Sequence, residues 1–140
     1  MSSLVNISEG SSLALHGLAI VAINSPKRVN VKYLAKTLNA SEAHLAKIFQ
    51  RLSKAGFVKS VRGPAGGFEL SENAIDINLL DIHETIEGKV NLHFCPLGKD
   101  SCQFTNCIFG SKLNKASEQI YNDLKEIKLS SFMKTLNIKN

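Results

Sequence analysis

The stretch between residues 31 and 70 constrains the fold most, because it places two short amphipathic helices and a hairpin in immediate succession. Residues 31–38 repeat apolar side chains on one helical face, and residues 41–54 do so again after a two-residue break. Ser41 suits the N-cap of the second helix, and Gly56 suits its C-terminal stop. Two short helices joined by a tight turn predict a helix-turn-helix.

A β-hairpin is predicted directly after these helices. Residues 57–62 alternate as a strand, the Gly-Pro-Ala-Gly-Gly run at 63–67 forms a turn, and residues 68–70 return as the second strand. A helix-turn-helix that is followed at once by a hairpin indicates a winged helix. The predicted fold class is therefore mainly α with a small β-hairpin wing.

The second helix of this unit carries a basic face. His44, Lys47, Arg51 and Lys54 are spaced 3, 4 and 3 residues apart, and Glu42 is the only acid on this helix. Either this face is simply solvated, or it is a recognition helix for the DNA major groove, and we expect the second. Arg51 or His44 would contact bases, while the wing would contact the backbone or minor groove. The predicted DNA-binding residues are Ser41, His44, Lys47, Arg51, Lys54, Lys59, Arg62 and Gly66.

Three further helices are predicted outside this unit. Residues 12–24 are apolar on nearly every face, which is typical of a buried helix, and Ser11 or Ser12 would cap it. Residues 79–87 form a helix between Asn78 and Gly88, with Leu79, Ile82 and Ile86 pointing inward. A long helix, roughly 111–128, has an apolar stripe that a small domain cannot bury, so it should pair with its copy in a homodimer. The stripe consists of Leu113, Ala116, Ile120, Leu124 and Ile127.

These patterns divide the chain into a winged-helix domain at 1–88, a cysteine-bearing loop at 89–110, and a dimerisation helix with a C-terminal tail at 111–140. The net charge of +5, from 17 basic and 12 acidic residues, admits a polyanionic partner. No secretory signal and no apolar run of about 18 residues is visible, which predicts a cytoplasmic protein without a membrane partner. The four histidines are scattered and no catalytic constellation stands out, so we do not expect an enzyme.

All three cysteines fall in one loop-like stretch with the spacing C-x6-C-x4-C. A loop can fold Cys95, Cys102 and Cys107 towards one point, but three thiolates are one short of a closed four-ligand site. In a reducing cytosol such a cluster of cysteines is more often metal-binding or redox-active than cross-linked. Two alternatives stay open: a cluster-free thiol switch, and a zinc-stabilised interaction module whose basic helix faces a protein.

The most specific motifs are Leu45-x-x-Ile48-Phe49-x-x-Leu52-x-x-Ala55-Gly56-Phe57-Val58, then Ser60-Val61-Arg62-Gly63-Pro64-x-Gly66-Gly67-Phe68, then Ile86-Glu87-Gly88, then three cysteines before a long helix. With these motifs the chain resembles the IscR/NsrR-type bacterial transcription regulators, the Rrf-two family. The resemblance implies a homodimeric winged-helix regulator, acting as a repressor on a pseudo-palindromic operator. It also implies an iron–sulfur cluster, [2Fe-2S] or [4Fe-4S], that senses nitric oxide, redox state or cluster supply.

The resemblance leaves the fourth ligand open. The IscR-like branch has a histidine where this chain has Gly110, and the NsrR-like branch has an aspartate where it has Ser12. A related redox-sensing type has a histidine at the position of His16. We therefore expect His16 to complete the site, reaching across from the partner subunit, with Ser12 and Glu9 nearby. The alternative for His16 is a plain interface histidine.

Overall fold

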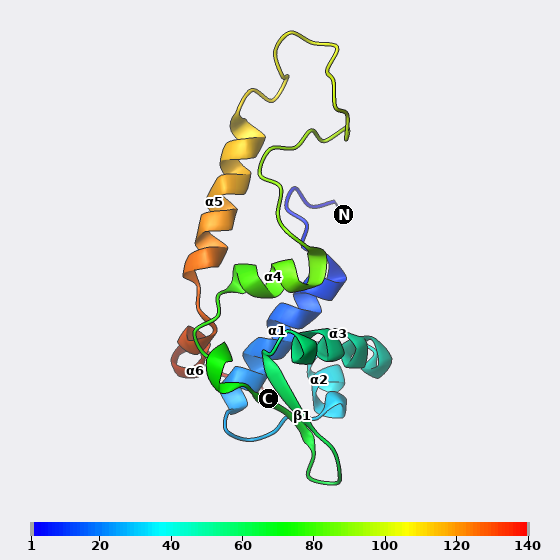
Figure 1. Cartoon of the computed structure of the whole chain (residues 1–140), viewed down its shortest axis with the longest axis vertical. Helices are drawn as coiled ribbons and strands as arrows, with labels where there is room; N and C mark the ends of the chain where they lie inside the picture. Colours follow the sequence, from blue (N-terminus) through cyan, green and yellow to red (C-terminus); the bar gives the residue numbers. More distant parts are fainter. Residues whose placement is uncertain (1, 140) are drawn as a thin grey trace.

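The computed structural model describes residues 2–139. Its elements are ordered along the chain as in Figure 1, which shows a helical body with a hairpin at one end of the long axis and an arm at the other. The elements of the body before the arm are α1 (Glu9–Asn24), α2 (Val31–Leu38), α3 (Glu42–Lys54), β1 (Val58–Val61), β2 (Gly67–Leu70), a 3-10 turn at Glu72–Ala74 and α4 (Leu79–Glu87). The remaining elements are α5 (Lys112–Glu126), a 3-10 turn at Leu129–Ser131 and α6 (Phe132–Thr135).

Helix α1 runs through the middle of the body and is buried on most of its faces, as its sequence predicted. Its N-cap is Ser8, whose hydroxyl accepts a hydrogen bond from the backbone N–H of Ser11. The prediction of Ser11 or Ser12 as the cap was therefore wrong. The helix begins earlier because Ser11 is itself fully buried, and its hydroxyl shares a hydrogen bond with the His83 ring.

The predicted helix-turn-helix is present with its caps. The Ser41 hydroxyl accepts a hydrogen bond from the backbone N–H of His44 at 3.2 Å. Asn39 provides the turn in the left-handed conformation, with φ at 51°. The apolar stripe of α3 is buried, and its Phe49 ring is fully enclosed, with its ring centroid 4.5 Å from that of Phe68 in β2. Helix α3 is thereby packed against both α1 and the wing.

The wing is an antiparallel hairpin in which Val58 pairs with Leu70 and Val61 pairs with Gly67. Its turn needs glycine, since a Cβ on Gly66 would lie 2.2 Å from the carbonyl oxygen of Val61. The loop after α1 adds a further backbone pairing to the hairpin. Val29 exchanges two backbone hydrogen bonds with Phe68, at 2.9 and 2.7 Å, and so ties the wing to the loop after α1.

Helix α4 has the predicted caps, Asn78 and Gly88. Leu80, Ile82 and Ile86 are its buried residues, whereas Leu79 is only partly buried, so the inward face is rotated slightly from the predicted one. This rotation follows from the start of the helix, where the Leu79 N–H donates to the Ile127 carbonyl at 3.0 Å and holds Leu79 at the edge of the core.

The C-terminal segment returns to the body. The Leu129 N–H donates to the Ile77 carbonyl at 2.9 Å, and the Leu129 side chain is fully buried in the core. Ile127 is the extended C-cap of α5, so its predicted place on the helical stripe was wrong. The tail beyond α5 therefore packs against the winged-helix domain, although the sequence analysis had grouped it with the helix that begins at residue 111.

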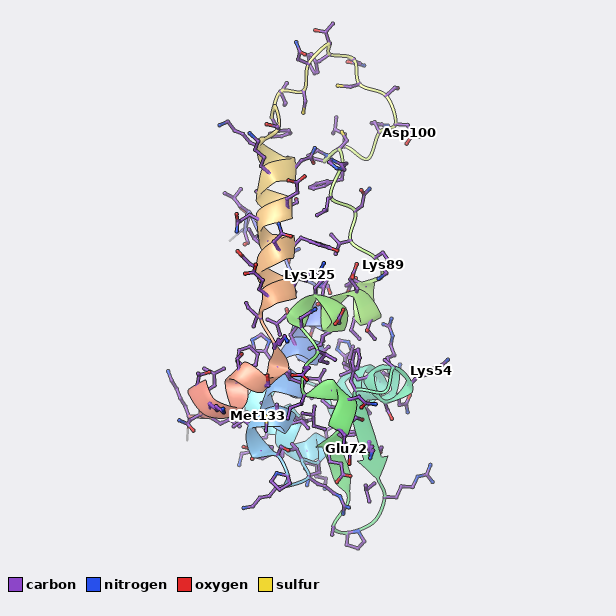
Figure 2. The ribbon with its side chains drawn as sticks, turned by 60° about the vertical axis from the view of Figure 1, so that its left-hand side comes forward. Lys54, Glu72, Lys89, Asp100, Lys125 and Met133 are labelled. Carbon is purple, nitrogen blue, oxygen red and sulfur yellow. The ribbon has the colours of Figure 1, made fainter. Side chains whose placement is uncertain are left out.

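The arm consists of α5 and the cysteine-bearing segment, which rise side by side from the body in both views (Figures 1 and 2). Helix α5 has no buried residue. Residues 93–112 are all exposed, so the cysteine-bearing segment contributes no side chain to the core. The arm places its cysteines at the end of the molecule opposite the wing.

We predict that Gly17→Ala destabilises the fold. The added Cβ would lie 2.8 Å from Cε2 of the enclosed Phe49 ring, so the packing between α1 and α3 would have to shift. Overpacking of this kind lowers the free energy of unfolding by about 1–3 kcal/mol, which urea denaturation would measure.

Gly10→Ala in the same helix is the matched control. Its Cβ would meet Ile48 and Ile86 at 3.5 Å, an ordinary contact, so the free energy of unfolding should rise by about 0.4–1 kcal/mol. Equal stabilities of the two variants would contradict the tight α1–α3 packing.

Candidate nucleic-acid interface and cysteine site

The basic residues of α3 and the wing are free of acidic partners. Within residues 2–139 the ion pairs are Arg28–Glu69 and Lys89–Glu84, and neither involves the predicted DNA-contacting cations. Lys47, Lys54, Lys59 and Arg62 are exposed, and His44 is half-buried. Lys54 extends outward from the end of α3 in Figure 2. The arrangement gives a helix and a hairpin with uncompensated positive charge, which suits a polyanion.

Ser41 and Gly66 hold the two ends of this surface in place. The exposed Ser41 caps α3 as an acceptor, which leaves its hydroxyl proton able to donate to another group. Gly66 sits in the wing turn, where its backbone N–H donates to the Gly63 carbonyl at 2.9 Å. Both residues therefore shape the positions from which the neighbouring cations project.

Arg28 supports the wing, although the sequence analysis assigned it no role. Its Nε donates to a Glu69 carboxylate oxygen at 3.1 Å, and its Nη1 is 3.4 Å from the Ala65 carbonyl oxygen in the wing turn. The hairpin is thus braced on the side that Val29 also contacts. The only signal in the sequence was a Lys-Arg pair at 27–28, in the loop that follows the helix predicted over 12–24.

Arg51 lies differently from its prediction as a base-contacting residue. Its Nη2 donates to the carbonyl oxygens of Thr85 and Ile86, at 3.0 and 2.8 Å. These carbonyls belong to the last turn of α4, where helical partners are missing and the helix dipole is negative. A guanidinium is well suited to that position, and the side chain is turned towards α4 for this reason.

Two contacts from α1 reach the same helix. The Ser11 hydroxyl and the Nδ1 atom of His83 share a hydrogen bond of 2.6 Å, and the Ser8 hydroxyl donates to the Glu87 carboxylate. His83 is half-buried, and nothing in its helical spacing indicated this contact. Helix α4 is therefore held by side chains from α1 and α3 together.

The three cysteines are free, exposed and gathered around one hollow. Cys95, Cys102 and Cys107 line a cavity of about 570 Å³ together with apolar side chains that include Leu97 and Phe104. They do not converge on one point, since no three His, Cys, Asp or Glu side chains among residues 2–139 form a group that could hold a metal ion. The donor set itself, three thiols in an apolar pocket, fits a soft metal or an iron–sulfur cluster.

His16 lies in α1, in the body, whereas the cysteine-bearing segment is part of the arm (Figure 1). Its side chain is exposed, and its Nδ1–H donates to the Ser12 carbonyl of the preceding turn at 2.6 Å. The other ring nitrogen, Nε2, has no such contact to its own helix. The structure does not bring His16 to the cysteines of the same chain.

The apolar stripe of α5 is only partly covered. Leu113, Ile120 and Leu124 are half-buried, while Ala116 is exposed. The neighbouring cysteine-bearing segment exposes further large apolar side chains. They are Phe94, Leu97, Phe104, Ile108 and Phe109.

Comparison with known proteins identifies the family. The sequence model of Rrf2, described as an iron-dependent transcriptional regulator, matches residues 7–135. This chain belongs to the Rrf2 family. An HTH-type transcriptional regulator of Aquifex aeolicus is 36% identical over 110 residues, which cover 76% of each chain. IscR of Vibrio atlanticus is 32% identical, and the match covers 86% of this chain and 70% of IscR. NsrR of Bacillus subtilis is also 32% identical, and that match covers 59% of this chain and 57% of NsrR.

Solved structures of Rrf2-type regulators share the fold. CymR of B. subtilis, the global cysteine regulator, superposes with a TM-score of 0.73 at 23% identity, over 96% of this chain and 100% of that one. T. potens IscR superposes with a TM-score of 0.70 at 26% identity, over 94% of this chain and 88% of that one. These likenesses confirm the predicted winged-helix fold class.

Membership in the Rrf2 family settles two coarse points. The family and its relatives are transcription regulators, so the chain is a DNA-binding regulator and the expectation that it is not an enzyme is confirmed. Among residues 2–139, no helix has both the length and the hydropathy needed to cross a membrane.

We predict that Arg62→Ala weakens DNA binding about equally for all sequences. The exposed Arg62 at the wing forms no ion pair within residues 2–139, and loss of one phosphate contact should reduce the salt slope of log K by about one. Fluorescence anisotropy with operator and random duplexes at several salt concentrations would measure both effects.

Lys134→Ala removes an exposed charge from α6, which packs on α1, and serves as the control. If the two variants bind alike, the wing does not contact the phosphate backbone.

Proposed function

We propose that this Rrf2 regulator is a homodimeric repressor whose operator affinity is set by an iron–sulfur cluster at Cys95, Cys102 and Cys107. The observation that carries the proposal is that all three thiols line one apolar hollow at the end of the arm. It agrees with the description of the family as iron-dependent. The signal would be nitric oxide, redox state or the supply of clusters.

For DNA binding we propose that α3 enters the major groove and the wing follows the backbone or minor groove. Arg51 is not counted among the DNA contacts, because its guanidinium is hydrogen-bonded to the end of α4. A two-fold dimer implies a pseudo-palindromic operator with half-sites one or more helical turns, about 34–36 Å each, apart. The contacts would come from Ser41, His44, Lys47, Lys54, Lys59, Arg62 and Gly66.

For the cluster we propose thiolate ligation by the three cysteines and a fourth, weaker ligand from the partner subunit. His16 suits that role because its side chain is exposed and its hydrogen bond to the Ser12 carbonyl uses Nδ1, which leaves Nε2 for a metal. When bound, the group supplies iron that reacts with nitric oxide and oxidants. The chain itself supplies the soft donors, the apolar walls that limit water, and a loop that can close around the group.

The alternative is a thiol switch without a cluster, in which the cysteines are oxidised directly. The exposure of all three thiols favours this candidate, since exposed thiols are open to oxidants. The fold likeness to CymR shows only that the scaffold is shared. A zinc-stabilised module with a protein-facing helix is a weaker candidate, because family membership makes the chain a DNA-binding regulator.

The deciding experiment is absorbance with iron, sulfide and zinc analysis of protein purified without oxygen. We expect visible charge-transfer bands and stoichiometric iron and sulfide, and we expect each Cys→Ser variant to lose them. Colourless protein with no iron would support the thiol switch, and stoichiometric zinc would support a zinc site. Full cluster content in all three Cys→Ser variants would overturn the sensor.

His16 is tested in the same preparation. His16→Ala should change the cluster spectrum and the response to nitric oxide, whereas His93→Ala, an exposed histidine of the arm, should change neither. An unchanged spectrum and response in His16→Ala would remove it from the ligand set.

We predict that Ile120→Asp yields monomers that bind operator poorly, because it places a charge in the apolar stripe of α5. Within the chain, Leu113, Ile120 and Leu124 of this stripe are only half-buried. Sedimentation velocity would measure the association state.

Asn122→Asp adds the same charge on an exposed position of α5 and should leave the dimer intact. A dimeric Ile120→Asp variant would place the subunit contact elsewhere.

A further inference from the structure

The cysteine-bearing segment leaves the body at the C-terminal end of α4, and the wing lies at the opposite end of the long axis (Figure 1). A change at the cysteines can reach the DNA-facing surface of the same chain only through elements that touch both. Helix α4 is such an element, because it packs against α1 and α3 and continues directly into the segment.

The first link is the contact of α3 with the last turn of α4. Arg51 donates from one nitrogen to the carbonyls of Thr85 and Ile86, at 3.0 and 2.8 Å. One nitrogen can serve both oxygens only while that turn keeps its helical shape. Ile86 is buried, so its carbonyl is fixed by the core as well. The contact therefore reports on whether the end of α4 is intact.

The second link ties the same turn to the start of the cysteine-bearing segment. The Glu84 carboxylate accepts a hydrogen bond from the Val90 N–H at 2.9 Å and lies 3.6 Å from the Lys89 ammonium. The Glu84 side chain is only 11% exposed and its hydrogen bond to Val90 is partly buried, whereas the Lys89 side chain is 92% exposed. The Gly88 N–H also donates to the Glu84 carbonyl, at 2.9 Å. Displacement of the segment would thus pull on the turn that Arg51 holds.

We propose that Arg51 is a positioning residue that carries the state of the cysteines to the recognition helix. It does so by capping the end of α4 when the segment is ordered and by losing those acceptors when the segment shifts. Release of the guanidinium would change both the seating of α3 and the charge on its DNA-facing side. This inference rests on the proposed function, since it requires that the cysteines control operator affinity.

A direct contact of Arg51 with a base or a phosphate would give a different result from a coupling role. Removal of a DNA contact lowers the affinity of both states by a similar factor and leaves their ratio unchanged. Removal of a coupling residue changes the ratio itself, because coupling is the difference between the two states. The ratio therefore separates the two roles.

The experiment compares wild type, Arg51→Gln and Lys54→Gln, the last being an exposed cation at the end of the same helix. Operator affinity is measured for protein purified without oxygen, before and after a nitric oxide donor and, separately, hydrogen peroxide. We expect the wild-type affinities to differ by about 5-fold or more, as typical coupling does. In Arg51→Gln the ratio should fall to within about 2-fold of one, and in Lys54→Gln both affinities should drop with the ratio preserved.

Hydrogen exchange of untreated protein provides a readout that needs no signal. Amides 85–90 should exchange faster in Arg51→Gln than in wild type or Lys54→Gln, because the last turn of α4 loses its cap. Unchanged exchange there, or a wild-type ratio retained by Arg51→Gln, would overturn the role of Arg51. A wild-type affinity that neither treatment changes would instead overturn the proposed function and the coupling with it.

Discussion

The packing of the Phe49 ring is the interaction on which the arrangement of the basic surface of α3 and the wing depends. The ring is fully buried, and it lies against Gly17 of α1 on one side and Phe68 of the wing on the other. Helix α3 cannot rotate or slide without moving that ring, so its basic face and the hairpin keep a fixed relation to each other. The direction in which Lys47 and Arg62 project follows from an apolar contact and not from their own charges.

Elements whose signals are local were predicted well. Ser41 and Asn78 were identified as caps because a cap is a contact within one turn, and the hairpin followed from alternation and a glycine-rich turn. What escaped prediction depends on residues distant in sequence. Ser8 replaced the expected cap because Ser11 is occupied by His83, and Ile127 left its helix because it pairs with the start of α4.

The sequence indicates which residue types the candidate site contains, but it does not indicate how they are arranged. Counting cysteines in a short loop indicates soft ligands, and the structure adds that all three line one hollow. It also shows that all three thiols are exposed. The turning of Arg51 towards α4 had no signal in its helical spacing, because the acceptors are backbone carbonyls more than thirty positions later. A ligand supplied by a second chain would likewise have no characteristic sequence spacing from the three cysteines.

The return of the chain at Leu129 has a consequence for how such regulators can diversify. Residues 88–126 form an excursion that departs from and comes back to the same helix, α4, with the Leu79–Ile127 bond closing it. Lengthening the loop between α4 and α5 within such a closed excursion adds a closure entropy that grows slowly with length, by about 0.6 kcal/mol per doubling. The outer part of the arm can therefore be lengthened, shortened or given other ligands by mutation without unfolding the body. New signals could in this way be acquired by one part of the gene while the operator-reading part stays under separate selection.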